Sequence, residues 1–366
     1  MSINRTEATT PEDQSAVGQV VLTVSLSIVA LLMGGISAGV VCLTVFLLMR
    51  FKVGSESAEK HGIAQVPSSR LGGVLVLGYM IFASIWIYWQ SGVFLLSQPQ
   101  VPAALVCLSI FAIGLLEDIT GLLQPLTRLL EMTVLVAVLL WLDPVLPMVS
   151  TGLSALDKML EVPLISFVFS LIGVLFLINA ANTADGANGL LAGTALVALW
   201  ILMQLSGLWI LAPLWTGLMV FALINIATGT LFLGDSGAYF IGVVLAVALI
   251  YTANQQLAPA WMLMSLVFYP TADFLVSLCR RLCCGGALMS ADNAHFHNML
   301  FGELGRSGWS CQVANSLTGV GVVLIWSLPT LVLFEVGVPA VTWAWLYAIY
   351  WVVFLSLWAV LFSRRR

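Results

Sequence analysis

Charged residues are scarce in this sequence. Asp, Glu, Lys and Arg together make up 8% of its 366 residues, whereas a soluble domain normally carries about a quarter. Hydrophobic residues reach 61%, and the mean hydropathy is +1.06. This composition excludes a soluble domain and indicates a membrane protein. The net charge of -4 says little about partners because so few charges contribute to it, and we expect no nucleic-acid partner.

The sequence also lacks the cysteine patterns of disulfide frameworks and zinc sites. Its six cysteines follow no framework spacing and the C-x-x-C signature is absent, so we expect reduced thiols. We also expect no signal peptide, because the polar start over residues 1–19 has no basic region followed by a short apolar core and a small-residue cleavage site.

Long apolar runs dominate the remainder of the chain. Since about 20 apolar residues cross a bilayer as a helix, the sequence predicts an all-α, polytopic integral membrane protein with about 11 transmembrane helices. The predicted spans cover residues 21–48, 71–91, 101–116, 127–146, 162–181, 189–206, 209–230, 237–253, 258–279, 314–335 and 339–362. Lys and Arg gather in the loops of one parity, which predicts a periplasmic N-terminus and a cytoplasmic C-terminus.

The polar stretch NAANTADGANGL, residues 179–190, interrupts two long apolar runs. Asn179, Asn182 and Asp185 step by three, so on a continuing helix they would share one face. The two glycines of the stretch would then end the helix and let a ligand approach the backbone closely. Polar groups this close to hydrocarbon are rare unless they are functional. The alternative is a solvated turn between two spans.

The polar clusters all fall in loops predicted to be cytoplasmic. These loops cover residues 49–70, 117–127, 182–188, 231–236 and 280–313. Ordinary turns would be divided between the two sides of the membrane, so this one-sided gathering favours a shared site. We therefore expect chemistry on a cytosolic substrate at the membrane surface.

The residue types in these loops indicate the chemistry. Four carboxylates provide hard oxygen ligands that suit Mg²⁺ or Mn²⁺: Glu117, Asp118, Asp185 and Asp235. Donors suited to a pyrophosphate accompany them: Arg128, Arg280, Arg281, Arg306, His295 and His297. Together they favour phosphoryl transfer from a nucleotide diphosphate. Two alternatives stay open, namely that Asp235 is a helix N-cap and that Arg280 and Arg281 only anchor a span. Asp273 lies inside a predicted span and is a functional candidate by default.

Four ordered motifs resemble those of one family. They are GLLEDITGLLQPLTRLL with its acidic pair, NAANTADGANGL, FLGDSG, and SADNAHFHNML with its H-x-H pattern; SSRLGG at residues 68–73 resembles a fifth signature. The chain therefore resembles the polyprenyl-phosphate N-acetylhexosamine-1-phosphate transferases, which form glycosyltransferase family 4 and include the MraY translocases. The compact H-x-H loop is more similar to the O-antigen-initiating branch than to MraY.

The resemblance implies transfer of an N-acetylhexosamine 1-phosphate from a UDP-sugar to undecaprenyl phosphate, with Mg²⁺ (or Mn²⁺) and release of UMP. It implies a single transmembrane catalytic domain over residues 20–366 after a polar tail over residues 1–19. It also implies a bacterial inner-membrane enzyme with its active site on the cytoplasmic face, and it allows a homodimer. By residue, the implied roles are catalysis for Glu117, Asp118, Asp185, His295 and His297, substrate binding for Arg70, Arg128, Asn179, Asn188, Asp273 and Arg280, and metal binding for Asn182 and Asp235.

Three positions depart from the family pattern. Glu117 replaces an aspartate, Asn188 replaces a second acid, and Asn298 replaces the last histidine of the H-x-H-H loop. These departures leave the choice of sugar and the level of activity open. Two other functions stay open as alternatives: a membrane lipid or solute transporter, and a catalytically silent partner that binds a lipid phosphate.

Overall fold

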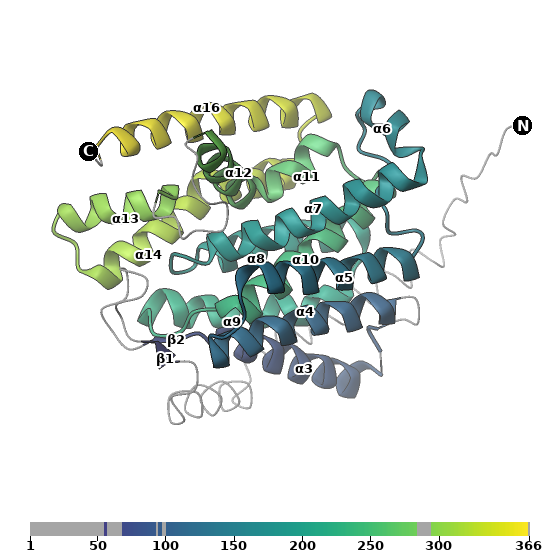
Figure 1. Ribbon diagram of the computed structural model, residues 1–366, viewed down its shortest axis with the longest axis horizontal. Helices are drawn as coiled ribbons and strands as arrows, with labels where there is room; N and C mark the ends of the chain where they lie inside the picture. The colour runs from purple at the N-terminus through teal and green to yellow at the C-terminus, as the bar shows by residue number, and fades with distance from the viewer. Residues whose placement is uncertain (1–54, 57–67, 93, 97–99, 284–293, 365–366) are drawn as a thin grey trace, which may run out of the picture.

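The computed structural model describes residues 55–56, 68–92, 94–96, 100–283 and 294–364 (Figure 1). Its elements are β1 (Ser55–Glu56), β2 (Ser68–Ser69), α3 (Gly72–Ser91), α4 (Val101–Thr120), α5 (Pro125–Leu142), α6 (Ser154–Leu160), α7 (Pro163–Ala184), α8 (Leu190–Ser206), η2 (Trp209–Leu211), α9 (Ala212–Thr228), α10 (Gly234–Asn254), α11 (Ala260–Leu266), α12 (Phe268–Cys283), α13 (Phe296–Arg306), α14 (Cys311–Val322), the π-helical turn η3 (Val323–Ser327), α15 (Leu328–Val336) and α16 (Ala340–Arg364). Apart from the short β1–β2 pair, the described structure is helical.

The described helices confirm an all-α, polytopic membrane protein. Eight of them are long and apolar enough to cross a membrane, the bent pair α11 and α12 makes up to nine, and α8 is a shorter apolar helix. Every predicted span except the first overlaps one helix or a run of two or three consecutive helices. The first, residues 21–48, lies outside the described residues. The count of eleven and the placement of the termini stay predictions.

The span predicted over residues 258–279 is divided between two helices. The chain bends by 80° between α11 and α12. Pro270 explains the position of the break, because a proline ring clashes with the carbonyl four residues earlier, here Leu266, the last residue of α11. Proline is tolerated in the first turn of the next helix, where Pro270 lies. The bend buries Tyr269 and Asp273 inside the protein.

The predicted loop boundaries also need correction. Helix α4 continues to Thr120, so Glu117 and Asp118 belong to its last turn and not to a loop. The helix ends where Gly121 adopts a φ of 62°, a left-handed conformation that favours glycine. Helices α7 and α10 likewise extend into the predicted loops 182–188 and 231–236. The polar residues are therefore carried by helix ends, which hold them more rigidly than loops would.

The loops fall at two opposite ends of the helix bundle (Figure 1). At one end, Gln312 Nε2 donates to the carbonyl of Ala227 at 2.7 Å, and Arg364 Nη1 lies 3.2 Å from Glu303 Oε1. At the other end, Asn254 accepts a hydrogen bond from the backbone N–H of Val149 at 2.9 Å. Loops of the same predicted parity thus share an end, and the polar motifs lie at the first of these.

Helix α10 lies at the centre of the bundle. Of its apolar stretch, 72% is buried, the largest share among the described candidate spans. Glycines let neighbouring backbones approach its first turn closely: a Cβ at Gly114 of α4 would overlap the backbone of Ser236, and one at Gly73 of α3 would overlap Gly237. The start of α10, with Asp235, is therefore enclosed by α3 and α4.

Candidate active site

The first turn of α10 is bound by a carboxylate from another helix. Asp118, at the end of α4, accepts the backbone N–H groups of Asp235 and Ser236, each at 2.9 Å. These N–H groups have no partner within their own helix, and the helix dipole favours an anion there. Asp118 is 7% exposed. The alternative that Asp235 itself caps the helix is wrong, since the cap position is Leu233 and Asp235 lies within the first turn.

The Asp235 carboxylate forms an ion pair with Arg128. Arg128 lies in the first turn of α5, and its Nη1 also donates to the hydroxyl of Tyr239 at 3.1 Å. The Tyr239 hydroxyl donates to Asp235 Oδ2 at 3.4 Å, one helical turn along α10. Glu117 Oε1 lies 3.8 Å from Arg128 Nη1. The acidic-pair motif and the FLGDSG motif thus meet around one guanidinium group.

The segment that carries Arg70 is fixed by backbone pairing. Phe232 donates to the carbonyl of Ser69 at 2.8 Å, and Gly72 donates to the carbonyl of Phe232 at 2.8 Å. Gly234, with a φ of 72°, follows directly and lies against the Arg70 carbonyl, where a Cβ would overlap. The SSRLGG signature is therefore docked on the strand-like segment before α10, which brings Arg70 to the site.

The NAANTADGANGL stretch turns sharply at the same place. Helix α7 ends at Ala184 and α8 begins at Leu190, so the predicted break is confirmed. Asp185, just past α7, accepts the backbone N–H of Gly234 at 3.2 Å through Oδ2. Asn182 lies one turn before Asp185 on the same face and is half-buried. Asn179 donates to the Leu175 carbonyl at 2.7 Å, within its own helix.

Acidic side chains outnumber basic ones at this site. They are Glu117, Asp118, Asp185 and Asp235, opposed by Arg70 and Arg128. Burial raises the pKa of Asp185 well above its usual range, and the charge of Asp118 raises it further. A bound divalent cation would favour the ionised form of such carboxylates, because it compensates negative charge on hard oxygen atoms. The donor set therefore fits Mg²⁺.

The geometry limits how such a cation would be held. Among the described residues, no three Asp, Glu, His or Cys side chains are grouped as a metal site. Asp118 already uses both oxygens for backbone N–H groups. Mg²⁺ usually keeps several waters and takes one or two carboxylates together with substrate phosphates. Asp185 and Asp235 can supply those carboxylates, whereas the predicted role of Asn182 as a ligand stays a prediction.

The two histidines form a buried unit with Asp273. His295 Nδ1 lies 3.0 Å from Asp273 Oδ2, and Asp273 Oδ1 accepts the backbone N–H of Phe296 at 2.8 Å. The rings of His295 and His297 stack with centroids 5.6 Å apart. His297 lies directly against Gly186, where a Cβ would overlap the imidazole. The H-x-H loop therefore reaches the NAANTADGANGL stretch, next to Asp185.

Asn188 belongs to a buried network of amides. Its Oδ1 lies 3.4 Å from both Asn225 Nδ2 and Asn315 Nδ2, and its Nδ2 donates to Ser316 Oγ at 3.1 Å. The side chain is 1% exposed. Asn188 thus holds the turn between α7 and α8, and its predicted contact with a substrate stays a prediction.

Asn225 is the centre of this network. Its Oδ1 accepts the backbone N–H of Gly189 at 2.6 Å, and its Nδ2 donates to the carbonyl of Leu231 at 2.7 Å. It therefore ties the α7–α8 turn to the segment before α10.

We expect Asn225→Leu to lower the free energy of unfolding by about 2 to 4 kcal/mol, because the Gly189 N–H and the Leu231 carbonyl would be left buried without partners. Thermal unfolding of the purified protein in detergent would measure this loss. Thr228→Val is the matched control, since Thr228 is exposed on the same helix and should change stability by about 0.5 kcal/mol or less. Equal losses in both variants would contradict the role of the network.

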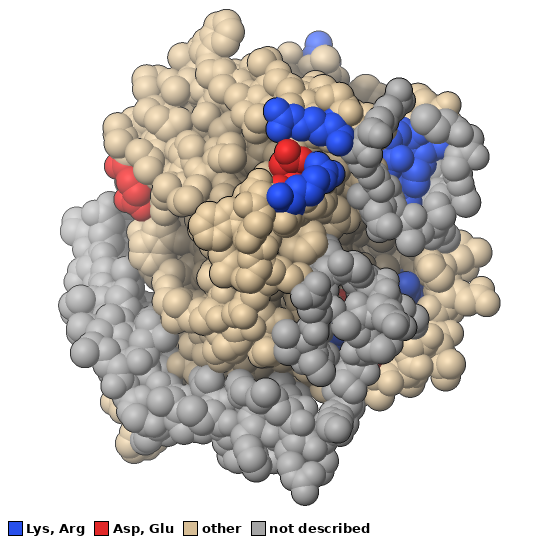
Figure 2. Space-filling view, turned by 90° about the vertical axis from the view of Figure 1, so that its left-hand side faces the viewer, with Lys and Arg blue, Asp and Glu red and all other residues tan. Residues whose placement is uncertain are grey.

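The remaining predicted basic residues are spread over this end of the bundle. Arg280 and Arg281 lie in the last turn of α12. Arg306 is 57% exposed and pairs with Glu303, which also pairs with Arg364 of α16. Figure 2 shows basic and acidic side chains gathered on this face. Glu303 therefore links α13 to α16 here, and the phosphate contact predicted for Arg306 stays a prediction.

Sequence reasoning missed several residues of the site. Tyr239 and Tyr269 contact Arg128 and His297 respectively, and Asn225 and Asn315 hold the turn. The two asparagines gave a usable signal, because an amide inside an apolar run is rare. The tyrosines gave none, since tyrosine is enriched at the ends of membrane helices whether or not it has a catalytic role.

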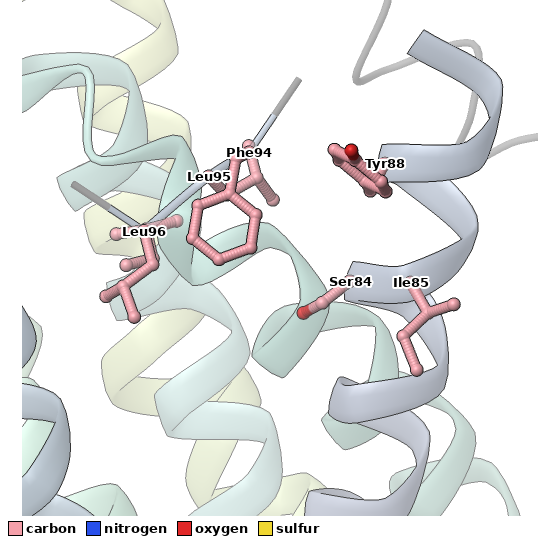
Figure 3. A pocket seen from close by; sticks show the side chains of 7 residues that line it. Ser84, Ile85, Tyr88, Phe94, Leu95 and Leu96 are labelled. Atoms are coloured by element: carbon pink, nitrogen blue, oxygen red, sulfur yellow. The ribbon is translucent and has the colours of Figure 1, made fainter. Parts of the chain in front are cut away.

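A cavity of about 280 Å³ lies at the opposite end of the bundle (Figure 3). Its lining is mostly apolar and comprises Ser84, Ile85, Tyr88, Phe94, Leu95, Leu96 and Ile210. None of the ionisable groups described above contributes to it. The convergence of charged residues, and not this cavity, therefore marks the candidate active site.

Comparison with known proteins gives consistent matches. The family model described as glycosyl transferase family 4 matches residues 101–253, which include both the α4 acidic pair and the FLGDSG motif. The decaprenyl-phosphate N-acetylglucosaminephosphotransferase of Mycobacterium tuberculosis is 28% identical over 287 residues, covering 68% of this chain and 69% of that protein. The undecaprenyl-phosphate alpha-N-acetylglucosaminyl 1-phosphate transferase of Thermotoga maritima is 27% identical, covering 69% and 73%. The Escherichia coli K12 protein of the same name is 26% identical, covering 47% and 50%.

Proposed function

Because the chain belongs to glycosyl transferase family 4, we propose that it transfers an N-acetylhexosamine 1-phosphate from a UDP-sugar to undecaprenyl phosphate. The products are an undecaprenyl-diphospho-sugar and UMP. The relatives named above act on decaprenyl or undecaprenyl phosphate, and their names specify N-acetylglucosamine. The length of the lipid and the identity of the sugar that this chain uses are therefore part of the proposal.

The convergence of the site carries the proposal. Carboxylates from α4, the α7–α8 turn and α10 meet Arg128 and the histidine unit at one end of the bundle. A sugar nucleotide brings a pyrophosphate, whose charge must be neutralised as the phosphoryl group transfers. Arg70, Arg128 and His297 supply donors for that charge. A bound Mg²⁺ would supply further neutralisation between the acidic side chains and the phosphates.

The lipid phosphate is the proposed nucleophile. A polyprenyl phosphate is already an anion at neutral pH, so it needs positioning and charge neutralisation more than activation. Asp118 has both oxygens committed to the α10 backbone, which suits a residue that orients the site and not one that attacks the substrate. We therefore favour a single displacement over a covalent enzyme intermediate.

The same reasoning gives the proposed setting. The chain is a multi-pass membrane protein. Among the described residues, the site end carries more Lys and Arg than the opposite end, and the positive-inside rule favours a cytoplasmic position for such an end. We propose a bacterial inner-membrane enzyme that starts O-antigen, lipopolysaccharide or a related surface glycan from cytosolic UDP-sugars.

An assay of UMP release tests the proposal directly. Purified protein would be offered undecaprenyl phosphate and a panel of UDP-N-acetylhexosamines, and we expect UMP to appear with one of them together with a lipid-linked sugar. The panel also identifies the sugar. Binding of the lipid phosphate without UMP release for any sugar would contradict the proposal and favour the catalytically silent partner.

In the same assay, removal of divalent cations should abolish turnover. We expect chelation to lower the rate by at least about 100-fold, because the excess carboxylates would repel the pyrophosphate instead of sharing a cation with it. Added Mg²⁺ or Mn²⁺ should restore the rate, and added Ca²⁺ serves as a comparison of a larger ion. A rate that survives chelation would contradict the assignment of a metal to Asp235.

A further inference from the structure

A buried tyrosine lies between the ring and the backbone of His297. The Tyr269 hydroxyl is 3.0 Å from His297 Nδ1, and the backbone N–H of His297 donates to the same hydroxyl at 3.2 Å. Tyr269 is 1% exposed and His297 is 2% exposed. Because both residues are buried, the Tyr269 hydroxyl is the hydrogen-bond partner of both the ring Nδ1 and the backbone N–H of His297.

The hydrogen atoms can be assigned from these two contacts. A backbone N–H can only donate, so the Tyr269 oxygen is the acceptor in the second contact. Among the described residues, the other contact of this buried hydroxyl is with Nδ1, so its own hydrogen finds an acceptor only if Nδ1 offers a lone pair. In a neutral imidazole one nitrogen accepts and the other carries the proton. The proton of His297 is therefore on Nε2.

Asp273 is the other side chain near His297 Nδ1 that could form a hydrogen bond with it. Its Oδ2 lies 3.5 Å from His297 Nδ1, farther than the Tyr269 oxygen at 3.0 Å. The same Oδ2 lies 3.0 Å from His295 Nδ1, and Oδ1 accepts the backbone N–H of Phe296. Asp273 is thus engaged by His295, and Tyr269 provides the shorter contact with His297.

The other ring nitrogen of His297 faces the candidate active site. Nε2 lies against Gly186, the residue after Asp185. A proton on Nε2 makes this atom a hydrogen-bond donor toward the stretch where the acidic side chains converge. A donor suits a phosphate oxygen, whereas an unprotonated Nε2 would face it with a lone pair.

Aromatic packing fixes Tyr269 in this position. Its ring lies 5.3 Å from Trp326, 6.1 Å from Phe296 and 6.2 Å from Phe354, measured between centroids. These neighbours come from three other elements, and Trp326 lies in the π-helical turn η3. The bend before α12 turns Tyr269 into this cluster, so the hydroxyl has little freedom to leave His297.

We propose that Tyr269 is a positioning residue that holds His297 as the Nε2–H tautomer, so that the imidazole donates a hydrogen bond to a phosphate of the substrate. The inference rests on the proposed function for the identity of the acceptor. The tautomer itself follows from the contacts of Tyr269 and does not require the reaction.

The test replaces only the hydroxyl. In Tyr269→Phe, His297 Nδ1 loses its donor and its nearest remaining partner is the Asp273 carboxylate, so the proton should move to Nδ1. We expect kcat to fall by about 10- to 100-fold with KM changed by about twofold or less. Tyr350→Phe is the matched control, because the Tyr350 hydroxyl is also buried in the aromatic cluster but bonds Thr330 and the Trp326 carbonyl.

Nitrogen NMR of the imidazole rings reads the tautomer without substrate. The chain has three histidines, so ¹⁵N-histidine labelling gives few signals, and the one lost in His297→Gln identifies His297. We expect an Nε2–H ring in the wild type and in Tyr350→Phe, and an Nδ1–H ring in Tyr269→Phe. An Nδ1–H ring in the wild type, or an unchanged tautomer in Tyr269→Phe, would overturn the inference. Absence of UMP release in the wild type would refute the proposed function instead, while the spectra still decide the tautomer.

Discussion

Asp235→Asn is expected to reduce the rate of UMP release by at least about 1000-fold. The substitution keeps the size of the side chain but removes the charge that pairs with Arg128 and that would hold a divalent cation. Loss of several kcal/mol of charge stabilisation in the transition state corresponds to this change in rate. The rate should be measured at saturating UDP-sugar and lipid phosphate, so that the effect appears in kcat.

Asp143→Asn is the matched control for this variant. Asp143 ends α5 at the opposite end of the bundle, where its Oδ1 accepts the backbone N–H of Val145 at 3.2 Å. An asparagine can keep that bond, so activity should stay within about twofold of the wild type. Thermal unfolding of both variants shows whether the fold is kept. An Asp235→Asn protein that is folded and fully active would contradict the proposed role of Asp235 in the reaction.

Gly186→Ala is expected to lower kcat by at least about 100-fold. The added Cβ would overlap the imidazole of His297, with the ring Cδ2 only 2.9 Å away, so the ring has to move out of the site. The backbone at Gly186 has no positive φ, so alanine brings no strain of its own. A displacement of about 1 Å at a catalytic group is enough to cost about 100-fold in rate.

Gly173→Ala controls for the substitution itself. Gly173 lies on an exposed face of α7, and a Cβ there meets nothing within 4 Å. Activity should be unchanged, and stability should rise slightly because alanine favours a helix. A double mutant gives the sharper test: if Gly186→Ala acts only through the imidazole, it should cause no further loss in a His297→Ala background. Additive losses in the double mutant would contradict this explanation.

Much of the fold follows from hydropathy. Runs of about 20 apolar residues predict the spans, because a helix in a bilayer must satisfy its backbone internally. The bend at Pro270 has a local cause and could have been predicted from that proline. The extension of α4 to Thr120 could not, because Glu117 and Asp118 look like loop residues until Asp118 is seen to bind the start of α10.

The candidate site was also predictable from the sequence only in part. Residue types and their one-sided distribution predict an acidic and basic cluster at one end, and Asp118, Asp185, Asp235, Arg128 and His297 do meet there. Their pairings depend on contacts between residues more than 40 positions apart, which no local pattern encodes. Asn188 shows the difference: its motif predicts a substrate contact, which stays a prediction, and gives no sign of its hydrogen bonds to Ser316 and Asn225.

The bond from Asp118 to the first turn of α10 has a consequence for the energetics of turnover. Two helices that are far apart in sequence are joined by a carboxylate and two amides before any substrate arrives. The dipoles around Asp235 are thus oriented when the chain folds, and no reorganisation energy is spent on them in each catalytic cycle. The free energy of orienting these dipoles is supplied once, during folding, and not again in each round of the proposed sugar-phosphate transfer.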